Sequence, residues 1–88
     1  MEITDVRLKV IDDHNRLKAI AAITIDGCFV VHELRVIEGD NGLFIAMPSK
    51  KLQSGEFRDV AHPINSETRD LIEKAIIDVY NETVKSAV

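Results

Sequence analysis

The chain has 88 residues and a mass of 9.8 kDa, which is enough for one domain because a second core usually requires roughly 150 residues. Apolar residues make up 45% of the chain and charged residues 30%, a composition typical of a folded domain rather than of a disordered segment. Eleven basic and fifteen acidic residues give a net charge of −4, which is the wrong sign for a protein that coats nucleic acid non-specifically. We therefore expect a single domain over residues 1–88.

The sequence predicts a cytoplasmic protein that does not enter a membrane. No apolar run approaches the roughly 20 residues that a membrane-spanning helix needs. Glu2 and Asp5 stand where a secretory signal carries basic residues, so no such signal is expected. Cys28 is the only cysteine, cannot form an internal disulfide, and suits a reducing compartment.

The first strand is predicted over residues 2–11, where apolar and polar residues alternate. Val6, Leu8 and Val10 fall on one face and charged residues on the other, which is the period of a half-buried strand. The polar cluster at 12–15 then predicts a turn, because short polar side chains bond to nearby backbone amides.

A hairpin is predicted next, formed by strands at 17–25 and 28–37. Asp26 and Gly27 lie between these strands and supply the positive φ of a two-residue turn, so the strands are antiparallel. The second strand begins with apolar residues on both sides. As one regular strand it would place Cys28, Val30, His32, Leu34 and Val36 on one face, and Phe29, Val31, Glu33, Arg35 and Ile37 on the other.

A second hairpin is predicted at Asn41-Gly42, a strong signal for a type I′ turn. The strand that follows covers residues 43–47 and ends at Pro48, which has no N–H to donate to a strand ladder. A short edge strand is expected over 57–61, after a polar loop.

A helix is predicted over residues 67–85, capped by Asn65 or Ser66. Its apolar residues recur at helical spacing and form one stripe: Leu71, Ile72, Ala75, Ile76, Val79, Tyr80 and Val84.

These elements predict an α+β fold: an antiparallel meander of four or five strands, followed by one C-terminal amphipathic helix that covers one sheet face. A single helix covers little more than one face. The apolar residues on both sides of 20–31 and 43–47 then leave surplus apolar surface, and we expect a homodimer to bury it.

No catalytic, metal or cofactor site is predicted. Cys28 and His32 share a strand face but lie roughly 13 Å apart, too far to bind one ion, and neither His14 nor His62 has a local chelating partner. His32 is expected to be partly buried and Cys28 to behave as a small hydrophobe. The serines lack a nucleophile-elbow pattern, and no glycine motif opens a phosphate-binding helix.

A small basic cluster is the remaining candidate for function. Lys50 and Lys51 lie in the polar loop, Arg58 follows nearby, and Arg69 falls in the first turn of the helix, whose free amides favour phosphate oxygens. A two-fold dimer would double the cluster to between four and eight charges. The residue pattern alone favours a solvated lysine loop over a phosphate site, and the chain lacks the aromatic set of an RNA-binding sheet.

Three stretches, MEITDVRLKV, FVVHELRVIEGDNGLFIAMPSKK and GEFRDVAHPINSETR, closely resemble the SpoVG family, bacterial proteins of septation and stage V of sporulation. The resemblance covers nearly the whole chain and implies a small cytoplasmic homodimer with an antiparallel sheet and a C-terminal helix. It also implies a role in septum formation and, in spore formers, in asymmetric septation. In non-sporulating bacteria the family looks like a global regulator that binds DNA, and in some cases RNA, with sequence preference, so the resemblance implies such a role here.

The resemblance places nucleic-acid binding on basic residues of the loop after Met-Pro-Ser and around the helix. Here these map to Lys50, Lys51, Arg58 and Arg69. Relatives can carry a further basic residue where this chain has 52–54 (Leu-Gln-Ser), a departure that bears on binding strength. Two functions are compatible with this: a dimeric nucleic-acid-binding regulator without a small-molecule substrate, or a protein–protein interaction module in septation that does not bind nucleic acid. Neither is an enzyme.

Overall fold

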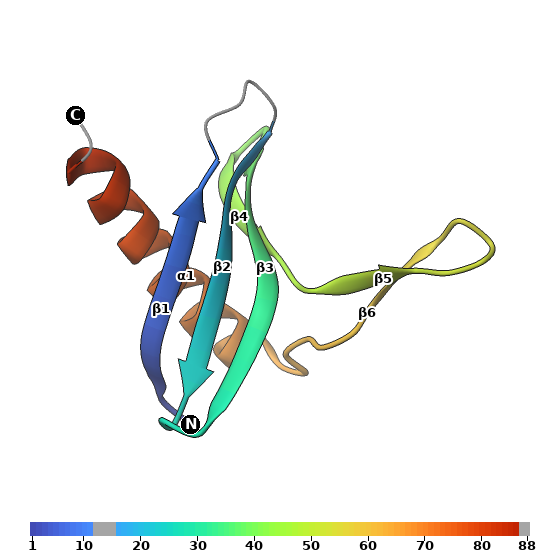
Figure 1. The fold of residues 1–88 in the computed structure, drawn as a ribbon, viewed down its shortest axis with the longest axis horizontal. Coiled ribbons are helices and arrows are strands. Elements are labelled where there is room, and N and C mark those ends of the chain that lie inside the picture. Colours follow the sequence, from blue (N-terminus) through green and yellow to red (C-terminus); the bar gives the residue numbers. More distant parts are fainter. Residues whose placement is uncertain (12–15, 87–88) are drawn as a thin grey trace.

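A four-stranded antiparallel sheet and one long helix form the body of the protein in the computed structural model, which describes residues 1–11 and 16–86. The predicted turn at 12–15, with His14, lies outside the described residues. The expected α+β fold and the meander of strands followed by a helix are confirmed (Figure 1). The elements of the body, with the strands adjacent in chain order, are β1 (Ile3–Val10), β2 (Leu17–Ile25), β3 (Phe29–Gly39), β4 (Gly42–Ala46) and α1 (Ser66–Ser86).

A second, two-stranded sheet projects from this body. It consists of β5 (Ser49–Lys51) and β6 (Phe57–Asp59), which pair with each other as an antiparallel hairpin. We call residues 48–60, which contain this hairpin, the arm (Figure 1). The sequence predicted a loop here and an edge strand at 57–61. The strand forms, but it pairs with β5 instead of extending the main sheet.

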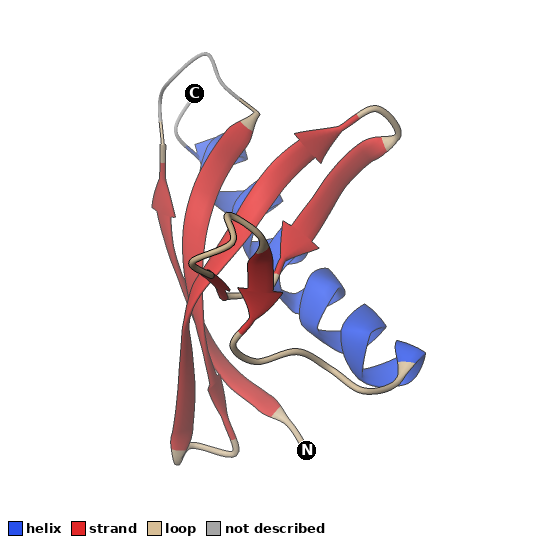
Figure 2. Ribbon diagram, turned by 90° about the vertical axis from the view of Figure 1, so that its right-hand side faces the viewer, coloured by secondary structure: helices blue, strands red, loops and turns tan. Residues whose placement is uncertain are grey.

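The core lies between α1 and one face of the sheet (Figure 2). The helix packs against β1, β2 and β4. Two alanines of β2 leave room for the helix to approach the sheet closely, and the longer side chains of β3 and β4 fill the remaining space. The buried residues are Ala19, Ala21, Ile23, Leu34, Val36, Ile45, Met47, Ile72 and Ile76.

The predicted apolar stripe of α1 is only partly buried. Ile72 and Ile76 are within the core, and Tyr80 packs against it, whereas Leu71 keeps 43% and Val84 38% of its surface exposed. A single helix on a wider sheet can bury only the side chains that point directly at the sheet, so the edges of its apolar stripe remain in contact with solvent.

A β-bulge interrupts β3 and changes which side chains face the core. Ala21 pairs with Leu34 and Ile23 pairs with Val31, so one residue of β2 lies opposite two residues of β3. Glu33 is the extra residue and has a φ of 66°, in the left-handed region that a side chain normally disfavours. Alternation therefore restarts at the bulge.

The bulge makes the predicted faces wrong for the part of the strand that precedes it, whereas Leu34 and Val36 share a face as predicted. Val31, and not Val30, packs against the core together with Leu34, and Val30 is 48% exposed on the other side of the sheet. His32 is exposed rather than partly buried. Cys28 lies in the turn before β3 and is exposed rather than packed as a small hydrophobe.

Both predicted hairpins form, with different turn geometries. Asp26 and Gly27 have φ values of 52° and 67°, as the predicted two-residue turn requires. In the second hairpin the loop residues are Asp40 and Asn41, and neither has a positive φ. The type I′ prediction is therefore wrong there. Gly42, which starts β4 with a φ of 120°, supplies the left-handed position instead.

The helix begins with a side-chain cap. The backbone N–H of Thr68 donates a hydrogen bond of 2.7 Å to Oδ1 of Asn65, so Asn65 rather than Ser66 is the capping residue. Glu67 in the first turn and Lys85 in the last complement the helix dipole. The helix therefore starts at a fixed residue, directly after the segment that returns from the arm.

Truncation of the central helix residue is expected to destabilise the fold strongly. Ile76 is fully buried, so Ile76→Ala should lower the free energy of unfolding by about 2–5 kcal/mol through lost burial and a cavity. Leu71→Ala, at a position 43% exposed on the same helix, should cost less than about 1 kcal/mol. Urea denaturation followed by circular dichroism measures both; equal losses would mean that the helix packs differently.

Glycine at the bulge is expected to stabilise the protein. Glu33→Gly removes the penalty of a left-handed side-chain residue, about 1–2 kcal/mol, and adds a smaller entropic cost, so a net gain of roughly 0.5–1 kcal/mol should follow. His32→Gly, at the exposed neighbouring position without a positive φ, should destabilise instead. Thermal unfolding of the two variants tests the bulge: a loss of stability in Glu33→Gly would contradict this geometry.

Candidate nucleic-acid interface

The arm is held together by its own backbone hydrogen bonds. The N–H of Val60 donates to the carbonyl of Pro48 at 2.7 Å where the arm leaves the body. At the tip, the N–H of Leu52 donates to the carbonyl of Glu56 at 2.7 Å, and the N–H of Gly55 donates to Leu52 at 2.9 Å. Gly55 has a φ of 92°, which a glycine adopts without strain and which closes the turn.

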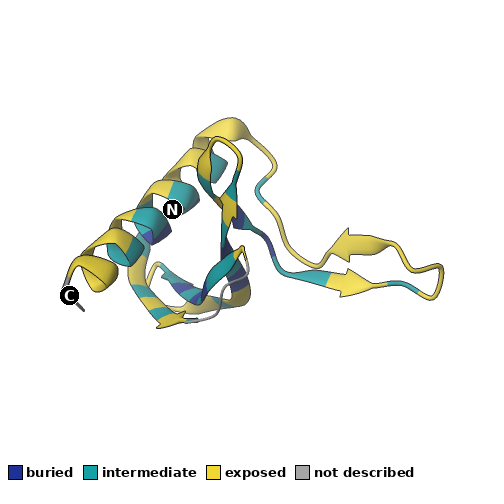
Figure 3. Cartoon of the chain, turned by 90° about the horizontal axis from the view of Figure 1, so that it is seen from above, coloured by how far each residue is buried: buried dark blue, intermediate teal, exposed yellow. Residues whose placement is uncertain are grey.

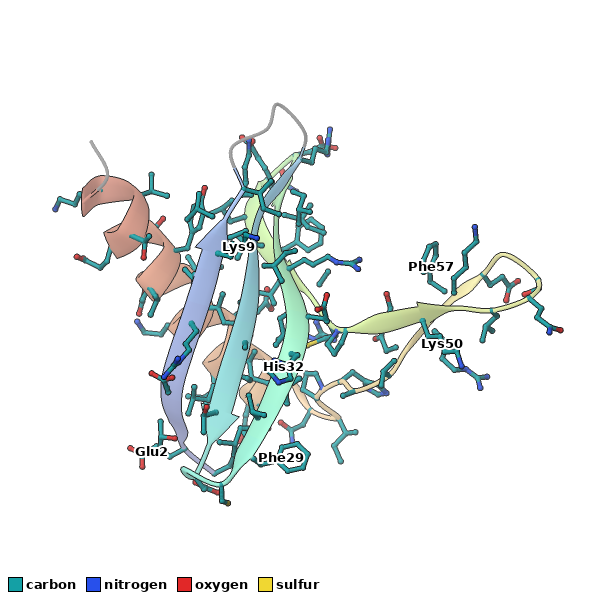
Figure 4. All side chains as sticks on the ribbon, in the orientation of Figure 1. Glu2, Lys9, Phe29, His32, Lys50 and Phe57 are labelled. Carbon is teal, nitrogen blue, oxygen red and sulfur yellow. The ribbon has the colours of Figure 1, made fainter. Side chains whose placement is uncertain are left out.

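Strand register sorts the side chains of the arm onto two faces. Residues directly opposite in an antiparallel pair point to the same side, and successive residues point to opposite sides. Lys50 pairs with Arg58, so these two cations share one face. Lys51 pairs with Phe57 on the other face. Ser49 and Asp59 form a second pair on that same face. Figure 4 shows Lys50 and Phe57 on opposite sides of the arm.

Lys50 and Arg58 form a pair of like charges about 5 Å apart at their Cβ atoms. Like charges directly opposite each other destabilise a strand pair, and the register places the carboxylate of Asp59 on the other face. An external anion bound between the two cations would relieve this repulsion. We call this pair the basic face of the arm.

The charge of the arm differs in sign from that of the body. Three cations and two carboxylates give residues 48–60 a net charge of +1. Because the whole chain has a net charge of −4, the remaining residues together carry −5. Among the described residues, every ion pair lies outside the arm: Arg7–Asp5, Arg16–Asp40, Lys18–Glu38 and Lys74–Asp78. The cations of the arm are thus exposed and not neutralised within the described chain.

Arg69 does not belong to the basic face. It lies in α1, where it is half-buried and its backbone N–H donates to the carbonyl of Asn65 at 3.2 Å. A connecting segment separates the start of α1 from the base of the arm (Figure 3). Because Asn65 already accepts from the N–H of Thr68, fewer amides are free at this helix end than the sequence suggested. Of the four predicted residues, the structure brings together two, Lys50 and Arg58, and separates Lys51 and Arg69 from them.

Sequence reasoning missed the apolar side chains of the arm and of the segment that follows it. Phe57 is 68%, Val60 69% and Ile64 90% exposed. Figure 3 shows the arm almost wholly exposed, apart from the body. A hairpin signal was present in Ser54-Gly55, which lies between two short segments that each contain strand-forming residues.

Neither metal ligation nor nucleophilic catalysis gains support from these side chains. Within residues 1–11 and 16–86, no three histidine, cysteine or acidic side chains lie close enough together to hold a metal ion. Cys28 and His32 are both exposed. In the same residues, no helix combines the length and the apolar character that crossing a membrane requires.

The fold and the arm together define a class: a small α+β protein whose helix-covered sheet carries a projecting two-stranded arm with a basic face. The sequence profile of the SpoVG family matches residues 1–82, and the chain belongs to the SpoVG family.

Curated relatives align along nearly the full length of the chain. A protein of Caldicellulosiruptor bescii is 55% identical over 86 residues, 98% of both chains. One of Clostridium novyi is 59% identical over 86 residues, 98% of this chain and 85% of the relative. One of Staphylococcus saprophyticus is 60% identical over 83 residues, 94% of this chain and 82% of the relative. Each of the three is named "Putative septation protein SpoVG".

Proposed function

We propose that this protein is a cytoplasmic, dimeric, nucleic-acid-binding regulator of cell division. The names of its relatives support a role in septation, and in a spore former this role would extend to asymmetric septation and sporulation. The family is named for septation and not for an enzymatic activity. The observation that carries nucleic-acid binding is the exposed, un-neutralised pair of Lys50 and Arg58 on one face of the arm.

The arm suits contact with a nucleic-acid backbone. Lys50 offers a compact charge, and Arg58 a planar group that can donate two parallel hydrogen bonds to one phosphate. A two-stranded ribbon also fits the major groove of B-form DNA, which is about 12 Å wide. Phosphate contacts position a protein but do not read sequence, so site preference would come from neighbouring arm side chains. DNA is the expected target, with RNA as a further ligand of the same charges.

Dimerisation would make this small site effective. One arm supplies two cations on its basic face, which is few for a binding site. A two-fold dimer would present four, with Lys51 and Arg69 of each copy as further candidates at the margins. Affinity would then depend steeply on salt, because every phosphate contact releases condensed counterions.

A second candidate function is a protein–protein interaction module of septation that does not bind nucleic acid. The observation that favours it is apolar: Phe29, Phe44 and Ile64 are 64%, 45% and 90% exposed on a chain of 88 residues. Surface of this kind is typical of protein contacts. Association through it would tolerate salt and would not need Lys50 or Arg58.

Loss of the basic face is expected to weaken nucleic-acid binding strongly without unfolding the protein. Fluorescence anisotropy with pools of labelled DNA and RNA should show binding that weakens roughly 100-fold or more between 50 and 200 mM salt, as about four phosphate contacts require. Lys50→Ala/Arg58→Ala should weaken binding at least tenfold at 50 mM salt and flatten the salt dependence. Its free energy of unfolding should stay within about 0.5 kcal/mol of wild type, since the side chains are exposed.

Lys74→Ala/Lys85→Ala is the matched control, because it removes the same charge from the exposed surface of α1 and should bind nearly as wild type does. A folded wild-type protein that binds neither pool at 50 mM salt would refute the regulator and favour the interaction module. Equal losses in both double variants would show that net charge matters and that the basic face does not form a site.

A further inference from the structure

The protein exposes more surface than a compact chain of its size. Its accessible surface is 6458 Å², whereas a compact monomer of this mass exposes roughly 5,200 Å². The Cα radius of gyration, 13.3 Å, likewise exceeds the roughly 12 Å of a compact domain. The excess of about 1,300 Å² per chain is more than the roughly 800 Å² that each partner buries in a standard protein interface.

The arm is the source of much of this excess. Neither β5 nor β6 packs extensively against another described element of the chain. Phe57, at 68% exposure, projects from the face of the arm opposite the basic face (Figure 4). A large apolar side chain on a rigid projection, with nothing of its own chain to cover it, needs a partner surface.

An apolar hollow of matching size opens in the body. It lies between the helix-covered face of the sheet and the first half of α1, and its volume is about 160 Å³. An apolar cavity of roughly 150 Å³ accommodates one benzene ring, so the hollow can take a phenylalanine side chain. Residues 61–63 form part of its rim, and its apolar wall consists of Ile23, Ile25, Val31, Leu34, Met47 and Ile72.

Phe57 cannot fill the hollow of its own chain. Phe57 is only four residues from Ala61, which lies at the rim of the hollow. Backbone hydrogen bonds from the Pro48–Val60 pair outward hold the arm as a two-stranded ribbon that points away from the body (Figure 1). Folding the arm back would break this ladder. A second copy of the chain, however, brings an identical arm and an identical hollow, which is the condition for a closed two-fold contact.

We propose that the Phe57 face of the arm docks on a second copy, with Phe57 inserted into that copy's hollow and the exchange made in both directions. This inference rests on the homodimer of the proposed function and names the surface through which it forms. Val60 and Ile64, on the segment between arm and helix, extend the apolar contact from the arm to the rim.

Docking through the Phe57 face leaves the basic face free. Lys51 and Asp59 both lie on the Phe57 face, so the charges of that face balance. Lys50 and Arg58, on the opposite face, stay exposed in the dimer. One ribbon thus binds the partner with one face and nucleic acid with the other.

Sedimentation velocity tests the proposal with three matched phenylalanine variants. Phe57→Ser should raise the dimer dissociation constant at least 30-fold, the effect of losing an interface residue worth about 2 kcal/mol. Phe29→Ser removes a phenylalanine of almost the same exposure that borders the hollow, since Phe29 pairs with Ile25 of its wall, and should weaken the dimer far less than Phe57→Ser does. Phe44→Ser, on β4, tests the competing dimer through the bare face of the sheet. Circular dichroism checks that each variant is folded.

Cross-linking between copies gives a readout that does not depend on affinity. One population carries Cys28→Ser/Phe57→Cys and the other Cys28→Ser/Thr68→Cys, because Thr68 lines the hollow at the start of α1. Oxidation of the mixture should yield a disulfide-linked dimer of one copy of each. Thr83→Cys in place of Thr68→Cys, near the other end of the helix, should not cross-link.

The outcomes separate this inference from the proposed function. Dimers in Phe57→Ser, or loss of the dimer in Phe44→Ser alone, would overturn the arm exchange and leave the regulator intact. A monomeric wild type would overturn both the exchange and the dimeric state. Loss of nucleic-acid binding by Lys50→Ala/Arg58→Ala with an intact dimer would confirm that the two faces have separate tasks.

Discussion

One helix must bury one face of a four-stranded sheet, and the rest of the structure depends on this packing. Ile72 and Ile76 of α1 pack against the short side chains of β2, and the small volume of Ala19 and Ala21 allows the helix to approach. Because the helix is alone, it leaves the opposite face of the sheet and both sides of its own stripe exposed. The chain thus folds around a minimal core, and surface that a larger protein would bury is available for contacts with other molecules.

The arm follows a different physical rule. It has no core, and its geometry comes from a short hydrogen-bonded ladder and the positive φ of Gly55. A two-stranded hairpin alone is marginally stable in water, so contacts outside the chain would contribute to its order. The register then determines which side chains share a face, since a shift of one residue would exchange the faces of Lys50 and Lys51. The arm is therefore the segment where binding to a partner and local structure are most closely linked.

Much of the fold could be predicted from the sequence, because the strands, the hairpins and the helix each have a local signal in alternation, turn residues or capping. The bulge at Glu33 could not, since glutamate gives no sign of a left-handed conformation, and this one residue reversed the predicted faces of the part of β3 that precedes it. The candidate site was predicted in composition but not in geometry. Lys50 and Lys51 are adjacent in the sequence and lie on opposite faces, whereas Lys50 and Arg58 are eight residues apart and lie side by side. Only the pairing of β5 with β6 reveals this.

The separation of arm and body has an evolutionary consequence. Substitutions on the exposed basic face touch no buried side chain, so under the proposed function they would alter what the protein recognises while the free energy of unfolding stays nearly constant. Substitutions can therefore accumulate at positions 50, 52–54 and 58 without compensating changes in the core. In this chain residues 52–54, at the tip of the arm, are Leu-Gln-Ser. If the arm binds as proposed, lineages that share this scaffold would diverge in their targets through substitutions in a single hairpin.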